Sequence, residues 1–354
     1  MRANRLFPRD CRGKRMKNKT VLLLVVVVLC VCAALLLRGQ RAEEPVVVDF
    51  FAMDTYMNLR AYDPKAAGGL KAAKEEILRL EDLWSVTRED SEIFALNRDG
   101  VADVSADTIG ILEQSKQVAE RSGYAFDVTV LPLVSAWGFH GGEYRIPGGE
   151  ELQEALKLVG SEGIEIEGGR VTLKTPGAGV DLGAVAKGCA SHRAVQTLRE
   201  AGVTSALVSL GGNVQALGAK PDGTPWRVAV QDPFDPNGYA GTLELTDRAA
   251  VTSGTYQRNF ERDGKIYHHL LDPSTGYPAD NSLASVTIVT GDGTLADALS
   301  TALFVMGMDE AVALWRSGVY SFDMVLVERN GVVSITEGLE GVFSSENGVS
   351  VIAY

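Results

Sequence analysis

The chain alternates between stretches with the apolar period of a strand and stretches with that of a helix. Residues 164–173 alternate between apolar and polar on both sides of Gly168-Gly169, which predicts a β-hairpin. An amphipathic helix is predicted where apolar residues recur at steps of three and four, at Leu70, Ala73, Ile77, Leu80 and Trp84.

Strands are more numerous than helices in this pattern and do not alternate strictly with them, which favours an α+β fold over a doubly wound parallel sheet. Segment 133–149, with five glycines, is predicted to be a loop or lid. Further helices are predicted over 105–123, 150–159, 184–202, 292–306 and 310–317. Strands are predicted over 50–62, 206–210, 226–230, 242–245, 249–253, 266–271 and 285–290, with a last hairpin about Asn330-Gly331.

Residues 21–37 contain no charge and follow a basic segment, residues 1–20. Seventeen apolar residues are the short end of a membrane span. Basic residues before the span predict an N-terminus inside the cell and a body outside it. We therefore expect a cytoplasmic tail over 1–20, a single N-terminal membrane-anchor helix over 21–37, a tether over 38–48 and an extracytoplasmic domain over 49–354.

Other interpretations of this N-terminal segment remain open. Cys30 and Cys32 allow lipidation, although Leu and Val precede them where a small residue is expected. The residues after the apolar run, Arg38 to Arg41, fit a cleavage site poorly. Met16 is an alternative start.

Charge and cysteine content exclude several classes of function. The whole chain has a net charge of −12 and residues 1–20 have a net charge of +7, so residues 21–354 have a net charge of −19. An acidic body without a basic stripe argues against a nucleic-acid partner. Cys189 is the one cysteine beyond the N-terminal segment, which excludes an internal disulfide and a cysteine metal site there. The four histidines include no ligand-spaced pair, which makes zinc a poor candidate.

A candidate ligand site lies around residues 178–213. Asp181 and Lys187 stand six residues apart across a turn that contains Gly183 and Ala184, both small enough for close approach of a ligand. The predicted helix begins at this turn, and its first N–H groups form a natural anion site. A phosphate-bearing ligand and a plain structural turn both fit this spacing.

Two further clusters contain side chains suited to catalysis. Asp297 and Thr301 are four residues apart on one helix face, either as an inconsequential pair or as hard oxygen ligands for Mg²⁺. His269, with Asp272 three residues on, is either a residue at a strand end or a general base with an ordinary pKa near neutrality.

Seven motifs, in this order and covering roughly residues 50–310, resemble those of the ApbE family, the FAD:protein FMN transferases. They are Met53-Asp54-Thr55, Ala125-Phe126-Asp127, residues 180–188, Gly211-Gly212-Asn213, Ser253-Gly254, residues 269–276 and residues 296–302.

The resemblance implies an α+β, T-fold-related domain of mixed sheets with flanking helices. It implies a Mg²⁺-dependent enzyme, often membrane-anchored, that splits FAD at its pyrophosphate and joins FMN to a Thr or Ser of a target protein. By resemblance, Ala184 (through its carbonyl), Asp297 and Thr301 would hold the metal, and His269 would deprotonate the acceptor hydroxyl. FAD would contact Met53, Trp84, Ala125, Phe126, Asp127, Asp181, Lys187 and Leu271. A Trp at this helix position, such as Trp84, is more often a core residue than one that stacks on a ligand.

Two positions depart from the family pattern. Asp54 stands where the family usually has Gly, and Thr255 where an acidic or amide residue is usual. The chain contains no acceptor motif of its own, so we expect a separate acceptor protein. An FAD pyrophosphatase that uses water as acceptor, and a non-catalytic FAD-binding lipoprotein, are the alternatives to a transferase.

Overall fold

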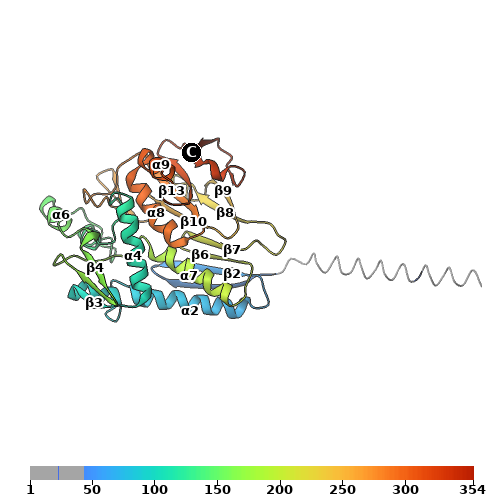
Figure 1. Cartoon of the computed structure of the whole chain (residues 1–354). Coiled ribbons are helices and arrows are strands. Elements are labelled where there is room, and N and C mark those ends of the chain that lie inside the picture. The colour runs from blue at the N-terminus through green and yellow to red at the C-terminus, as the bar shows by residue number, and fades with distance from the viewer. Residues whose placement is uncertain (1–22, 24–43) are drawn as a thin grey trace, which may run out of the picture. The chain divides into compact units, whose positions relative to one another are not determined.

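A nine-stranded sheet forms the centre of residues 45–354 (Figure 1). The computed structural model describes residue 23 and residues 44–354. Neighbouring strands of the sheet run antiparallel except for the last two, which are parallel. From edge to edge the strands are β1 (Val46–Ala52), β2 (Thr55–Ala61), β6 (Ala206–Leu210), β7 (Asn213–Leu217), β10 (Ala249–Gly254), β13 (Leu283–Thr290), β14 (Asp323–Glu328), β15 (Val333–Thr336) and β17 (Val349–Ile352).

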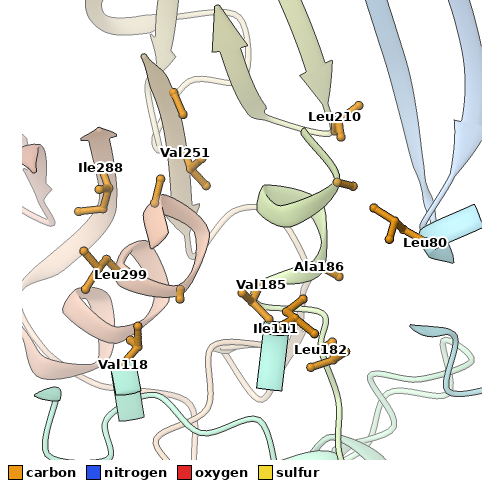
Figure 2. Close-up of a cluster of buried hydrophobic side chains, with 14 of the residues drawn as sticks. Leu80, Ile111, Val118, Leu182, Val185, Ala186, Leu210, Val251, Ile288 and Leu299 are labelled. Carbon is orange, nitrogen blue, oxygen red and sulfur yellow. The ribbon is translucent and has the colours of Figure 1, made fainter. Parts of the chain in front are cut away.

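Three helices pack against one face of this sheet: α2 (Ala66–Trp84), α7 (Ala186–Glu200) and α8 (Gly293–Met306). Helix α7 lies between the other two, and α8 packs against β10 and β13. Alternate strand residues and the apolar stripes of the helices meet in one core. Figure 2 shows part of this core, with Leu80 of α2, Ile288 of β13 and Leu299 of α8.

A three-stranded sheet covers part of the opposite face. It consists of β8 (Trp226–Gln231), β9 (Tyr239–Leu245) and β16 (Phe343–Ser344), with β9 in the centre. Two smaller sheets lie outside these layers: β3 (Val101–Asp103) with β5 (Arg170–Leu173) and β4 (Ile164–Glu167), and the hairpin of β11 (Asn259–Arg262) and β12 (Lys265–His268).

The remaining helices are α3 (Glu92–Asp99), α4 (Ala106–Arg121), α5 (Leu131–Trp137), α6 (Gly149–Leu156), α9 (Met308–Arg316) and the short 3₁₀ turns Ser161–Gly163 and Glu337–Leu339. The Ser105 side chain caps α4 by accepting the N–H of Thr108, and the Asp292 side chain caps α8 by accepting the N–H groups of Thr294 and Leu295.

The predicted α+β class is confirmed, and most predicted elements are present within a few residues. Three predictions were wrong in detail. Segment 50–62 is not one strand, because Met53 and Asp54 adopt positive φ angles of 48° and 55° and turn β1 back into β2. Segment 133–149 begins inside α5, which packs Leu133 and Trp137 into a small separate hydrophobic core. The strand predicted over 266–271 ends at His268.

The predicted anchor over 21–37 lies outside the described residues, except for residue 23. Among the residues that are described, no helix has the length and apolar character needed to cross a bilayer. The anchor and the extracytoplasmic location therefore stay predictions.

Candidate active site

One cavity of about 1110 Å³ opens between the ends of β2, β7 and β10 and the segment that leads into α7. Within the described residues, it is lined by every residue that the resemblance assigned to FAD, the metal or the base. These are Met53, Trp84, Ala125, Phe126, Asp127, Asp181, Ala184, Lys187, His269, Leu271, Asp297 and Thr301.

The segment before α7 places Asp181 at the cavity wall. The backbone N–H of Asp181 donates to the carbonyl of Val128 (2.7 Å), and its Oδ1 accepts the N–H of Gly183 (2.8 Å). Its Oδ2 lies 2.9 Å from Nε2 of His140. Burial alone would raise the pKa of Asp181, but the hydrogen bond and charge of His140 hold it below its usual value.

Lys187 lies in the first turn of α7 and reaches back to the same segment. Its Nζ donates to the carbonyl of Gly183 (2.9 Å). This contact keeps the ammonium at the cavity, next to the N-terminal end of α7. Both features favour an anionic group at this point.

Asp297 lies on α8 where α7 and α8 come closest. Oδ2 of Asp297 accepts the N–H of Gly188 (2.7 Å), a contact possible because a Cβ at position 188 would lie 2.4 Å from Cβ of Asp297. Thr301 follows one turn later, with its Oγ1 3.2 Å from Oγ of Ser253. Burial raises the pKa of Asp297, and Lys187 and the Gly188 amide only partly offset this effect.

These donors fit a hard divalent cation. The carboxylate of Asp297 and the hydroxyl of Thr301 both line the cavity, as does Ala184, and a buried carboxylate with a raised pKa gains from a cation beside it. Within residues 44–354 no group of three or more His, Cys, Asp or Glu side chains is placed to hold a metal. An oxygen set this small suits Mg²⁺, which keeps water or phosphate oxygens as its other ligands.

His269 follows β12 directly and is oriented by the backbone of Arg258. The carbonyl of Arg258 lies 3.0 Å from the backbone N of His269 and 3.2 Å from its Nδ1. A proton on Nδ1 satisfies this contact and leaves Nε2 as the acceptor. Burial, followed by the positive charges of Arg258 and Lys187, lowers the pKa of His269 to about 3, so the ring is neutral.

The β1–β2 turn forms another wall of the cavity. The N–H of Met53 donates to Oε1 of Glu81 on α2 (2.6 Å), which fixes the turn against the helix. The turn needs positive φ at Asp54, which explains why glycine suits this position and why Asp is a tolerated departure. Oδ2 of Asp54 also lies 4.0 Å from Nη2 of Arg258, and both residues line the cavity.

Two of the residues predicted to contact FAD, Trp84 and Asp127, form hydrogen bonds within the protein. The indole N–H of Trp84 donates to Oγ1 of Thr108 (3.0 Å), and the ring is 5% exposed, as a core position requires. Asp127 accepts hydrogen bonds from the backbone N–H groups of Thr129 (2.7 Å) and Ser161 (2.9 Å). The Asp127 carboxylate therefore stabilises the backbone around Thr129 and Ser161. It contributes to the cavity by positioning this part of the wall.

Sequence reasoning did not single out His140, Arg258 or Glu81, which also line the cavity. His140 was noted only as one of four histidines, inside a segment predicted to be a loop. The carboxylate partner of His140 is 41 residues away and that of Met53 is 28 residues away. The spacing of neighbouring residues does not predict contacts between residues so far apart in the sequence.

The fold is shared with ApbE proteins of known structure. The ApbE protein of Thermotoga maritima is 33% identical with a TM-score of 0.79, covering 84% of this chain and 99% of that one. Among relatives, the FAD:protein FMN transferase of Treponema pallidum is 36% identical over 285 residues (74% of this chain, 79% of the relative). That of Klebsiella pneumoniae (strain 342) is 34% identical over 285 residues (78% and 87%).

The ApbE family model itself matches residues 53–325, a range that includes every residue lining the cavity. The chain therefore belongs to the ApbE family.

Proposed function

We propose that this protein is an FAD:protein FMN transferase that releases AMP. The observation that carries the proposal is that one cavity brings Asp297, Thr301, Lys187 and His269 together. It is supported by relatives of that name at 34–36% identity. The reaction forms a bond between the FMN phosphorus and a Ser or Thr oxygen of a separate acceptor protein. It breaks the bond between that phosphorus and the bridging oxygen, which leaves with AMP.

In this proposal the side chains of Asp297 and Thr301 and the carbonyl of Ala184 hold Mg²⁺. The ion, when bound, neutralises charge that develops on the pyrophosphate oxygens. Lys187 supplies a second, fixed positive charge from the start of α7. Phosphoryl transfer depends mainly on such positioning and electrostatic stabilisation.

His269 acts as the general base in the proposal. Its neutral ring, with Nδ1 directed to the Arg258 carbonyl, presents Nε2 to take the proton of the acceptor hydroxyl. The negative charge of bound pyrophosphate raises its basicity once the substrate is in place. The proton is then available for the departing phosphate or for solvent.

The remaining walls fit the flavin and the adenosine. The cavity, at about 1110 Å³, is at the upper end of sites for drug-sized ligands, as a dinucleotide requires. Phe126 and Leu271 supply apolar surface, and Met53, Trp84, Ala125, Asp127 and Asp181 shape the rest of the wall.

The test is a transfer assay with residues 42–354, FAD, Mg²⁺ and a peptide carrying an acceptor Ser or Thr. We expect AMP in the chromatogram and a peptide heavier by one FMN, both lost with EDTA. AMP with an unmodified peptide would instead indicate a pyrophosphatase, and bound FAD without AMP a carrier. His269→Ala should slow transfer by about 100-fold or more with FAD affinity retained, whereas unchanged transfer would remove His269 from the mechanism.

A further inference from the structure

His140 is the one histidine of the 138–147 segment, and it pairs with Asp181 across the cavity wall. Its Nε2 lies 2.9 Å from Oδ2 of Asp181, whose other oxygen accepts the N–H of Gly183. Both side chains are mostly buried, 29% and 14% exposed, and both line the cavity. Both oxygens of the Asp181 carboxylate are therefore hydrogen-bonded, and His140 is the partner of one of them.

The backbone presents His140 from a shaped turn. Gly138 ends α5 with a φ of 73°, and a Cβ there would lie 2.0 Å from the carbonyl oxygen of Glu143. The N–H of Arg145 donates to the carbonyl of Trp137 (3.1 Å), which closes the segment on itself. Phe139 packs its ring edge-on to that of His269, at 6.5 Å between centroids. The segment thus places His140 on one side of the cavity and fixes it there.

We propose that His140 is a positioning residue for nucleotide binding: it fixes the Asp181 carboxylate and neutralises its charge beside Gly183 and Lys187, where the cavity favours an anionic group such as the FAD pyrophosphate. This inference rests on the proposed function for the identity of the ligand. His140 lies outside the motifs through which the chain resembles the ApbE family.

The charges that face His140 determine the pH dependence. Asp181 raises the pKa of His140 through its hydrogen bond and charge, and Asp54 adds to this, while burial and Arg258 oppose it. The net effect raises the pKa above its usual value. Below that pKa the pair is neutral overall, and above it the pair carries one negative charge. Since the FAD pyrophosphate is anionic, FAD affinity falls as the pH rises through the pKa of His140.

The test is a titration of the full-length protein with FAD in EDTA, which prevents turnover, followed by flavin fluorescence at pH 6.0 and pH 8.5. For the unaltered protein we expect the Kd to rise about fivefold between these pH values. His140→Ala removes a charge-assisted hydrogen bond, so its Kd at pH 6.0 should be about tenfold higher and nearly independent of pH. His140→Gln keeps a donor without the charge, so it should bind with intermediate affinity and little pH dependence.

His192→Gln is the matched control. His192 also faces a carboxylate, with Nδ1 3.8 Å from Oδ1 of Asp292, but it does not line the cavity. This variant should keep the affinity and the pH profile of the unaltered protein. A double-mutant cycle with Asp181→Asn should show strong coupling to His140→Ala.

The outcomes separate this inference from the proposed function. FAD binding without pH dependence, or a His140→Ala variant that binds like the unaltered protein, would overturn the role of His140 and leave the transferase intact. Additive effects in the double-mutant cycle would do the same. A protein that binds no FAD at either pH would contradict both.

Discussion

At the residue scale, the two buried aspartates of the cavity show opposite uses of a carboxylate. Asp127 receives backbone N–H groups on both oxygens, so its burial is compensated within the loop. Asp297 receives one backbone N–H, and its raised pKa shows that its charge is poorly compensated by the protein. A buried carboxylate such as Asp297, whose charge destabilises the folded protein, is expected at a functional site.

We predict that Asp297→Asn stabilises the metal-free protein and abolishes transfer. The amide keeps an oxygen for the Gly188 N–H but removes the buried charge, so the free energy of unfolding should rise by about 1 kcal/mol. Transfer should fall by about 1,000-fold or more. Urea unfolding and the AMP assay measure the two effects. Added Mg²⁺ should raise the Tm of the unaltered protein and leave that of the variant unchanged.

Asp127→Asn is the comparison variant. Its amide NH₂ would face a backbone donor, so we expect a loss of about 2 kcal/mol in the free energy of unfolding. If Asp297→Asn were equally destabilising, or if it kept full activity in Mg²⁺, Asp297 would be a structural carboxylate and the metal assignment would be wrong.

At the scale of elements, the contact between α7 and α8 sets the geometry of the site. Helix α7 carries Lys187 and α8 carries Asp297, and Gly188 lets the two backbones approach closely. A Cβ on Gly188 would lie 2.2 Å from the carbonyl oxygen of Gly293, and that atom cannot move without moving α8. The spacing between Lys187 and Asp297 therefore depends on the absence of a side chain at Gly188.

We predict that Gly188→Ala costs about 3 kcal/mol of unfolding free energy and at least 100-fold in transfer, because the helices must separate. Gly110→Ala in α4 is the matched control. It has no atom within 4 Å of its Cβ position, and the gain in helix propensity should stabilise the protein by about 0.5–1 kcal/mol with activity unchanged. Equal stability of the two variants would show that the helices tolerate a wider spacing.

At the scale of the whole molecule, buried His268 links the fold to pH. It is 4% exposed, packs edge-on against Phe304 of α8, and its Nδ1 has no hydrogen-bond partner among the described residues. Burial lowers the pKa of His268 to about 4 from the ordinary 6.5. The folded state therefore favours the neutral ring.

The sign of the effect follows from proton binding. Between pH 6.5 and pH 4 the unfolded chain binds a proton at this residue and the folded protein does not, so stability is lost as the pH falls through this window. We predict that the stability of the unaltered protein relative to His268→Gln falls by about 3 kcal/mol from pH 7 to pH 4. Urea unfolding at a series of pH values measures this difference. A difference that stays constant with pH would show that His268 is readily solvated in the folded state.

The sequence predicted much of this fold because its signals are local. The stripe of α2, the Ser105 cap of α4 and the Gly168-Gly169 hairpin each depend on residues within a few positions of one another. The errors occurred where a local signal was absent or overridden. A turn built from Met53 and Asp54 lacks the usual glycine, and α5 is a short helix in a glycine-rich segment.

The sequence by itself determined the α+β class, the family resemblance and the set of side chains available for chemistry. It did so because periodicity and motif spacing are properties of neighbouring residues. Only the tertiary structure decided which of them meet: it joined His140 to Asp181, Glu81 to Met53, and the Arg258 carbonyl to His269. Such contacts arise when packing brings distant segments into one cavity, and burial there then sets the protonation of Asp297 and His269.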